Sequence, residues 1–82
     1  MTQSREDLIK ELIATEIPCE FIYIEGDGTH FFATIVSEAF TGKRLIQRHQ
    51  MVYGILGDRM KEEIHALSMT TLTPEEHKAK QG

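Results

Sequence analysis

Two short runs rich in aromatic and β-branched residues flank a glycine-containing turn in the first half of the chain. The first run covers Cys19–Glu25, the second covers His30–Ser37, and Gly26–Thr29 lies between them. Two such runs joined by a short turn predict a β-hairpin. The alternation of apolar and polar residues is imperfect in both runs, so the sequence does not assign the buried face of either strand.

A helix is predicted before this hairpin. Ser4 stands three residues before Asp7, which is the spacing of a capping box. Apolar residues then recur at helical spacing, at Leu8, Ile9, Leu12 and Ile13. Pro18 ends this pattern, because proline lacks a backbone donor and disfavours helix before it. We expect this helix to cover about Ser4–Thr15.

A second helix is predicted after a link over Glu38–Thr41. An apolar stripe defines its inner face and consists of Leu45, His49, Val52, Tyr53 and Leu56. Gly57 is suited to end it. Asp58 is suited to cap a short further segment over Arg59–Glu63.

A third strand and a last helix complete the pattern. The strand is expected over Ile64–Leu72. Thr73, Pro74 and Glu76 then supply an N-cap, a proline at the first helical position and a glutamate at the third. This helix is expected to be short.

The order of elements predicts a single α+β domain over residues 1–82. A helix lies between the second and third strands, which suits a right-handed crossover. We therefore expect a three-stranded mixed sheet with helices packed on one face. The other face is expected to be partly open to water or to a partner.

Composition excludes several classes of protein. The net charge is −4, so any nucleic-acid binding has to come from a local basic patch. One cysteine allows no disulfide within the chain, and no apolar run reaches the length of a membrane span. Acidic residues near the start argue against a targeting peptide. A cytoplasmic protein is the expected class.

The basic residues Lys43, Arg44 and Arg48 cluster at the start of the second helix. With the following turn they could form a patch similar to a helix-turn-helix. A solvated helix face is the more common outcome for such a cluster.

Histidines are the main candidates for chemistry, because no catalytic sequence motif is present and no enzyme is expected. His49 lies on the apolar stripe and is expected to be a packed, hydrogen-bonded structural residue, while His77 is expected to be solvated. His30 follows the glycine-containing turn and His65 lies where a helix meets a strand, so each is either an exposed polar residue or a functional one. Cys19 is expected to be a small buried apolar residue.

Five segments in order resemble the BolA family, in its short bacterial-type branch. They are Gly26–Phe31, Phe40–Lys43, Arg48–Tyr53, Ile64–Ser68 and Leu72–Glu76. The resemblance implies an αββααβα fold similar to class II KH domains. The segment Gly42–Leu45 lacks the second glycine of a KH loop, so a KH-type clamp on single-stranded nucleic acid is not expected.

The same resemblance implies a function and its ligands. BolA-like proteins pair with monothiol glutaredoxins and act in iron–sulfur cluster handling and iron regulation. By this resemblance His65 and His30 are the ligands of a bridging [2Fe–2S] cluster, and a glutaredoxin cysteine and a glutathione thiolate supply the others. Lys43, Arg44 and Arg48 would meet the glutaredoxin. The alternative is a DNA-binding transcriptional regulator that uses this basic patch. The sequence leaves open whether the free protein is a monomer or a homodimer.

Overall fold

The structure is a computed structural model that describes residues 4–27, 29–57 and 65–81. Its elements follow one another as α1 (Arg5–Glu16), β1 (Phe21–Gly26), β2 (Phe31–Val36), the short 3₁₀ helix η1 (Glu38–Phe40), α2 (Leu45–Leu56), β3 (Leu67–Leu72) and α4 (Pro74–Gln81).

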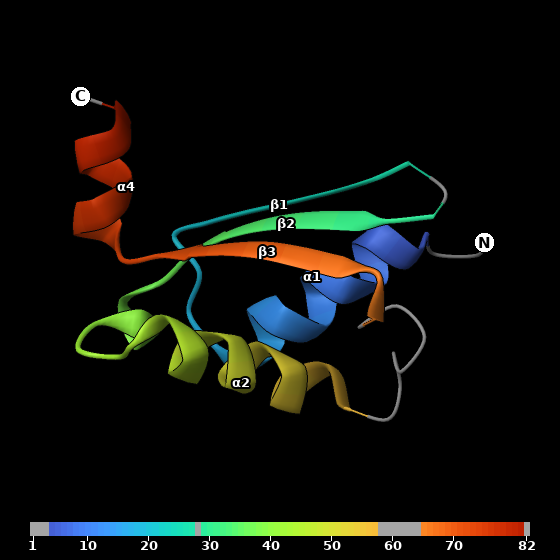
Figure 1. The fold of residues 1–82 in the computed structure, drawn as a ribbon, viewed down its shortest axis with the longest axis horizontal. Helices are drawn as coiled ribbons and strands as arrows, with labels where there is room; N and C mark the ends of the chain where they lie inside the picture. Colours follow the sequence, from blue (N-terminus) through green and yellow to red (C-terminus); the bar gives the residue numbers. More distant parts are fainter. Residues whose placement is uncertain (1–3, 28, 58–64, 82) are drawn as a thin grey trace.

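The three strands form one mixed sheet in the order β1-β2-β3. β1 pairs with β2 in antiparallel fashion, and β2 pairs with β3 in parallel, with Phe31 opposite Leu67. The connection from β2 to β3 passes through α2, as parallel neighbours require. Figure 1 shows α1 and α2 beneath one face of the sheet, whereas α4 rises at the far end of β3. The predicted α+β mixed sheet is confirmed.

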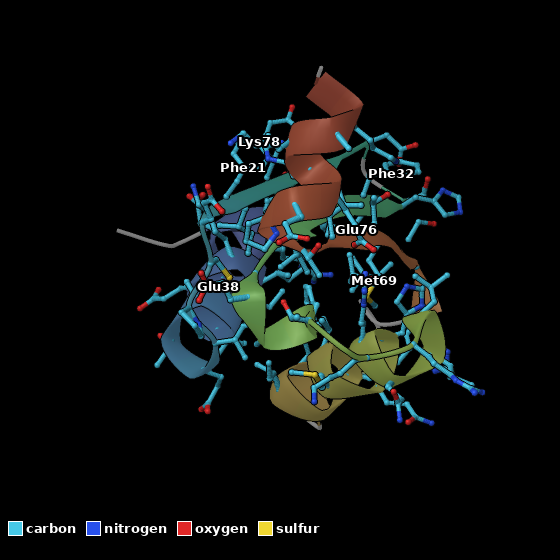
Figure 2. All side chains as sticks on the ribbon, turned by 90° about the vertical axis from the view of Figure 1, so that its left-hand side faces the viewer. Phe21, Phe32, Glu38, Met69, Glu76 and Lys78 are labelled. Atoms are coloured by element: carbon cyan, nitrogen blue, oxygen red, sulfur yellow. The ribbon has the colours of Figure 1, made fainter. Side chains whose placement is uncertain are left out.

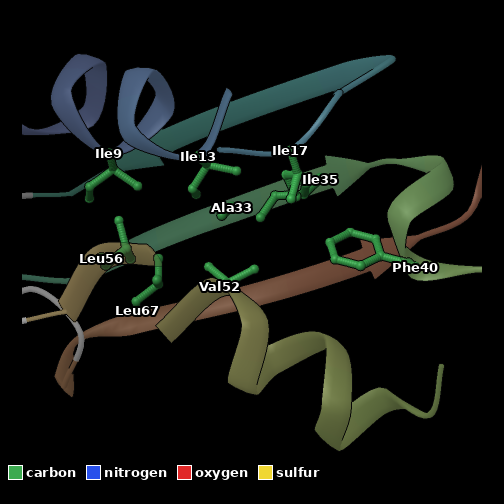
Figure 3. Close-up of a cluster of buried hydrophobic side chains, with 9 residues drawn as sticks. All are labelled: Ile9, Ile13, Ile17, Ala33, Ile35, Phe40, Val52, Leu56 and Leu67. Atoms are coloured by element: carbon green, nitrogen blue, oxygen red, sulfur yellow. The ribbon is translucent and has the colours of Figure 1, made fainter. Parts of the chain in front are cut away.

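The hydrophobic core fills the space between the sheet and the helices α1 and α2. Figure 3 shows side chains from both helices facing side chains of β2 and β3. The buried cluster consists of Ile9, Ile13, Ile17, Ala33, Ile35, Phe40, Val52, Leu56 and Leu67. Among the described residues, no helix is both long enough and apolar enough to cross a bilayer.

Three predicted element ends are confirmed. Ser4 Oγ accepts a hydrogen bond from the Asp7 N–H at 3.1 Å and so caps α1. Thr73 and Glu76 form a reciprocal capping box before α4, with distances of 3.1 Å and 2.9 Å. Gly57 follows α2 with a φ of 49°, a backbone conformation that favours glycine. Local sequence therefore defines where these helices begin or end.

The predicted inner stripe of α2 is partly wrong. Val52 and Leu56 are buried as expected, but Leu45 is 60% exposed and Tyr53 is 37% exposed. Arg48 is buried in their place and is 9% exposed. The inner face of α2 is therefore rotated toward Arg48, because this side chain has buried polar partners.

The third strand begins later than predicted. β3 starts at Leu67, and His65 has helical backbone followed by a turn at Ala66. The predicted cap Asp58, the segment Arg59–Glu63 and Ile64 lie outside the described residues.

The sheet face turned away from α1 and α2 carries exposed aromatic rings. Phe21 is 43% exposed, Tyr23 51% and Phe32 45%. Figure 2 shows Phe21 and Phe32 on the side of the sheet from which α4 rises. The ring of Phe21 stacks on His77 of α4 at a centroid distance of 5.5 Å. This contact holds α4 against the end of the sheet.

Candidate metal centre

Two histidines lie at the same end of the two parallel strands. His30 directly precedes β2, and His65 stands two residues before β3. The Phe31 N–H donates to the Ala66 carbonyl at 2.8 Å, which joins the two backbones at this end. Residues 35 positions apart in the chain therefore meet at one edge of the fold.

The turn before β2 holds the backbone of His30 through Asp27. The carboxylate Oδ1 of Asp27 accepts from the His30 N–H at 2.7 Å and from the Thr29 N–H at 3.0 Å. The Asp27 N–H donates to the His30 carbonyl at 3.1 Å. The backbone hydrogen bonds from Thr29 and then from His30 lower the pKa of the Asp27 carboxyl. Asp27 thus stays ionised and organises the turn at neutral pH.

The side chain of His30 is open to solvent but is not without neighbours. It is 62% exposed, with Nδ1 3.1 Å from Thr29 Oγ1 and 4.0 Å from Asp27 Oδ1. His65 is also exposed, at the turn that leads into β3. Both imidazoles can therefore be reached by a partner from outside the sheet.

The donor set fits part of a metal centre and does not complete one. Within the described part of the chain, no three His, Cys, Asp or Glu side chains come together in a way that could hold a metal ion. A [2Fe–2S] cluster takes four protein ligands, and paired histidines on one iron occur in such clusters. Two exposed histidines at one edge fit one iron of a shared cluster, provided that a partner supplies the other ligands.

The remaining soft ligands lie elsewhere or are packed. Cys19 precedes β1 at the opposite end of the hairpin, roughly 17 Å along a six-residue strand from His30. Its Sγ donates to the Ile17 carbonyl, and burial raises the pKa of the thiol. The prediction that His77 is solvated is wrong, because His77 is half-buried against the ring of Phe21. Neither residue shares an edge with His30 and His65.

His49 is half-buried on α2, as its position on the apolar stripe suggested. Its Nε2 is buried, and within the described residues it has no hydrogen-bond partner. The hydrogen bond predicted for this structural histidine is therefore not found at Nε2.

The predicted basic patch is divided by the structure. Lys43 and Arg44 are exposed at the start of α2, which lies at the end of the molecule away from His30 and His65 (Figure 1). The inclusion of Arg48 in an exposed patch is wrong, because its guanidinium is buried and engaged. Its nitrogens donate to the Lys43 carbonyl at 3.0 Å, the Thr71 carbonyl at 3.1 Å and Glu76 Oε1 at 2.7 Å.

Arg48 joins three elements rather than facing a partner. The pair with Glu76 links α2 to α4, and the bond to Thr71 links α2 to β3. The guanidinium also lies 6.0 Å from the centre of the Phe40 ring. The hydrogen bond from Arg48, followed by that from the Thr73 N–H, lowers the pKa of Glu76. We assign Arg48 a structural role.

The hydrogen-bond partners of His30 and Arg48 were not identified from the sequence. The sequence places Asp27 and Thr29 in the predicted turn, where an aspartate two residues before a threonine can bond the backbone ahead of it. The sequence predicts Glu76 as part of a helix cap, and nothing local indicates its pairing with Arg48, 28 residues earlier. The Asp27 turn could have been predicted from the sequence, whereas the Arg48–Glu76 pair could not.

Comparison with known proteins decides the family. The family model described as BolA-like protein matches residues 14–76 of this chain. The chain belongs to the BolA family. This BolA protein is 39% identical to SufE-like protein 1 of Arabidopsis thaliana, with 88% of the chain aligned to 23% of that protein. It is 36% identical to the DNA-binding transcriptional regulator BolA of Haemophilus influenzae, over 93% of this chain and 84% of that protein.

The fold agrees with solved structures of the family. The BolA domain of SufE1 from Arabidopsis thaliana matches with a TM-score of 0.80 and 35% sequence identity, covering 93% of this chain and 99% of that domain. The sequence resemblance to BolA proteins and the predicted fold class are thus confirmed. The matched family is not named for an enzyme activity.

Proposed function

We propose that this BolA protein is a partner of a monothiol glutaredoxin in iron–sulfur cluster handling and iron regulation. His65 and His30 are assigned as ligands to one iron of a [2Fe–2S] cluster that bridges the two proteins. A glutaredoxin cysteine and a glutathione thiolate are assigned to the other iron. In this proposal the protein works in the cytoplasm.

The parallel register of β2 and β3 carries the proposal. Because Phe31 pairs with Leu67 and bonds to the Ala66 carbonyl, His30 and His65 lie at one edge and both are exposed. Had the strands paired in the opposite direction, the two histidines would lie at opposite ends of the sheet. This shared end of the strands supports the assignment of His30 and His65 as two of the four ligands, and in the proposal a partner supplies the rest.

The residues of this chain have distinct parts in the proposed site. Histidine ligands on one iron raise the reduction potential of a bound cluster relative to all-cysteine ligation. Both imidazoles have to be neutral to ligate, so cluster binding is expected to weaken at acidic pH. Asp27 holds the backbone of His30 in place before any partner arrives.

Visible circular dichroism of the protein mixed with cluster-loaded monothiol glutaredoxin tests the proposal. A new spectrum is expected on mixing, and the variant His65→Ala is expected to abolish it. His77→Ala is the matched control, because His77 lies in α4 at the other end of β3 and should leave the spectrum unchanged. A wild-type spectrum that persists in His65→Ala would rule out this ligand assignment.

A second candidate function is DNA binding. The Haemophilus influenzae relative is named a DNA-binding transcriptional regulator, and Lys43 and Arg44 are exposed here at the start of α2. Since Arg48 is engaged with Glu76, we limit the proposed phosphate contacts to these two residues.

Gel-shift assays across salt concentrations test this candidate. Each lost phosphate contact is expected to reduce the slope of log affinity against log salt by about 1. Lys43→Ala and Arg44→Ala should each have that effect, whereas Lys10→Ala on the exposed side of α1 should not. Equal slopes for all three variants would contradict DNA binding through the start of α2.

A further inference from the structure

Three side chains in the turn between β1 and β2 form a connected chain that ends at the ring of His30. Asp27 Oδ1 lies 3.1 Å from Thr29 Oγ1, and Thr29 Oγ1 lies 3.1 Å from His30 Nδ1. The backbone N–H groups of Thr29 and His30 both donate to the same Asp27 oxygen. These bonds fix the hydroxyl of Thr29 between a carboxylate and an imidazole.

The Thr29 hydroxyl has one proton, which it can donate either to Asp27 Oδ1 or to His30 Nδ1. A carboxylate oxygen accepts, and Asp27 Oδ1 already accepts from the backbone N–H groups of Thr29 and His30, so it is an acceptor for this hydroxyl as well. A hydrogen bond to an ionised acceptor is about twice as strong as one between neutral groups, so this proton points to Asp27. The lone pairs of Thr29 Oγ1 then face His30 Nδ1, which has to be the donor.

The charge of Asp27 favours the same arrangement directly. His30 Nδ1 lies 4.0 Å from Asp27 Oδ1. A proton on Nδ1 is attracted to this carboxylate, whereas a lone pair on Nδ1 is repelled by it. Both the relayed contact and the direct one favour a proton on Nδ1 and a free lone pair on Nε2.

We infer that Asp27 and Thr29 are positioning residues for His30, which hold its imidazole in the Nδ1–H tautomer and leave Nε2 as its metal-binding atom. The identity of the metal centre rests on the proposed function. The tautomer does not, because it is set by the chain itself. Histidine ligands in metalloproteins usually donate their second ring N–H to a carboxylate, a carbonyl or a water, which orients the ring and increases its basicity. Here a threonine hydroxyl links the ring to the carboxylate.

Long-range ¹H–¹⁵N correlation spectra of the metal-free ¹⁵N-labelled protein test the tautomer. The spectra are recorded at alkaline pH, where a free imidazole is neutral and its two nitrogens are distinguishable. We expect His30 to show a protonated Nδ1 and an unprotonated Nε2. A free imidazole prefers the opposite tautomer, and His77 in α4 provides an internal reference in the same spectrum.

Two variants of Thr29 separate the hydroxyl from the shape of the side chain. Thr29→Val keeps the β-branched shape but removes the hydroxyl that relays the carboxylate to the ring, so it is expected to raise the Nε2–H share of His30 even though the direct Asp27 contact remains. Thr29→Ser keeps the hydroxyl and is expected to preserve Nδ1–H. A wild-type His30 with its proton mainly on Nε2, or a Thr29→Val variant with an unchanged tautomer, overturns the inference.

Cluster binding by the same variants tests the role in ligation. Titration with cluster-loaded glutaredoxin should show Thr29→Val binding about 10- to 100-fold more weakly, and Thr29→Ser close to wild type. A changed tautomer with unchanged cluster affinity overturns the positioning role. If the wild type binds no cluster, the proposed function is wrong, while the NMR result still decides the tautomer.

Discussion

Replacing Arg48 with methionine should destabilise the fold without removing any exposed charge. Arg48 is 9% exposed, and its guanidinium donates to the backbone carbonyls of Lys43 and Thr71. Hydrogen bonds from a charged donor contribute about 1.5–3 kcal/mol each, and a buried acceptor left without a partner adds a cost. The pair with Glu76 is left out of this sum, because that carboxylate is 46% exposed and water can replace its partner.

Methionine recovers part of the loss by packing, so we expect a net decrease of about 3 kcal/mol in the free energy of unfolding. A chain of 82 residues has a total stability of roughly 4–12 kcal/mol. Urea unfolding followed by circular dichroism measures the change. With a slope of about 1 kcal/mol/M, the midpoint should fall by about 3 M.

Arg44→Met is the matched control for this measurement. Arg44 is exposed, so its replacement should change stability by less than about 0.5 kcal/mol. Arg48→Lys keeps the charge but loses the forked geometry, and is expected to fall between the two. Equal midpoints for Arg48→Met and Arg44→Met would refute the structural role of Arg48.

Three further variants test other parts of the fold. Because the folded pKa of Glu76 is lowered, its contribution to stability is present above its ordinary pKa and is lost as the pH falls through the folded pKa. Below about pH 5, the free energy of unfolding of Glu76→Gln should therefore fall less with decreasing pH than that of the wild type. Urea unfolding at a series of pH values measures this, and the same decrease in both proteins would contradict the prediction. Gly57→Ala should cost about 1–3 kcal/mol through backbone strain, since φ is 49° and, among the described residues other than its chain neighbours, no atom lies within 4 Å of the added carbon. Ser37→Ala should lower the free energy of unfolding by about 1–3 kcal/mol, because Ser37 is fully buried and donates to the Pro18 carbonyl at 2.6 Å. Thermal unfolding measures both changes. If Gly57→Ala or Ser37→Ala unfolds at the same temperature as the wild type, the cause stated for that variant is wrong.

Local sequence was sufficient wherever a local contact determines the structure. The caps of α1 and α4 depend on residues three positions apart, and Gly57 is needed for its own backbone angle. The β1–β2 hairpin was likewise visible as two strand-like runs around a short turn. In each case, the residues that determine the helix end or the turn lie within a few positions of one another.

The orientation of α2 could not be predicted in the same way. Hydropathy assigns an arginine to solvent and a leucine to the core, yet Arg48 is buried and Leu45 is exposed. The reason is the pairing of Arg48 with Glu76, which exists only once β3 and α4 have docked. Similarly, the register that places His30 and His65 at the same end of the sheet depends on the parallel pairing of β2 and β3. The resemblance to BolA proteins indicated these two histidines, but their shared edge became visible only in the fold.

Because β2 pairs in parallel with β3, His30 and His65 come to the same end of the sheet only in the folded protein. In an unfolded chain the two histidines are 35 positions apart, and nothing holds their side chains near each other. If the proposed cluster is held by both histidines, it closes a long loop in the native state only and so acts as a removable cross-link. A bound protein should then resist heat better than the metal-free one, by an amount that grows with the concentration of the ligand.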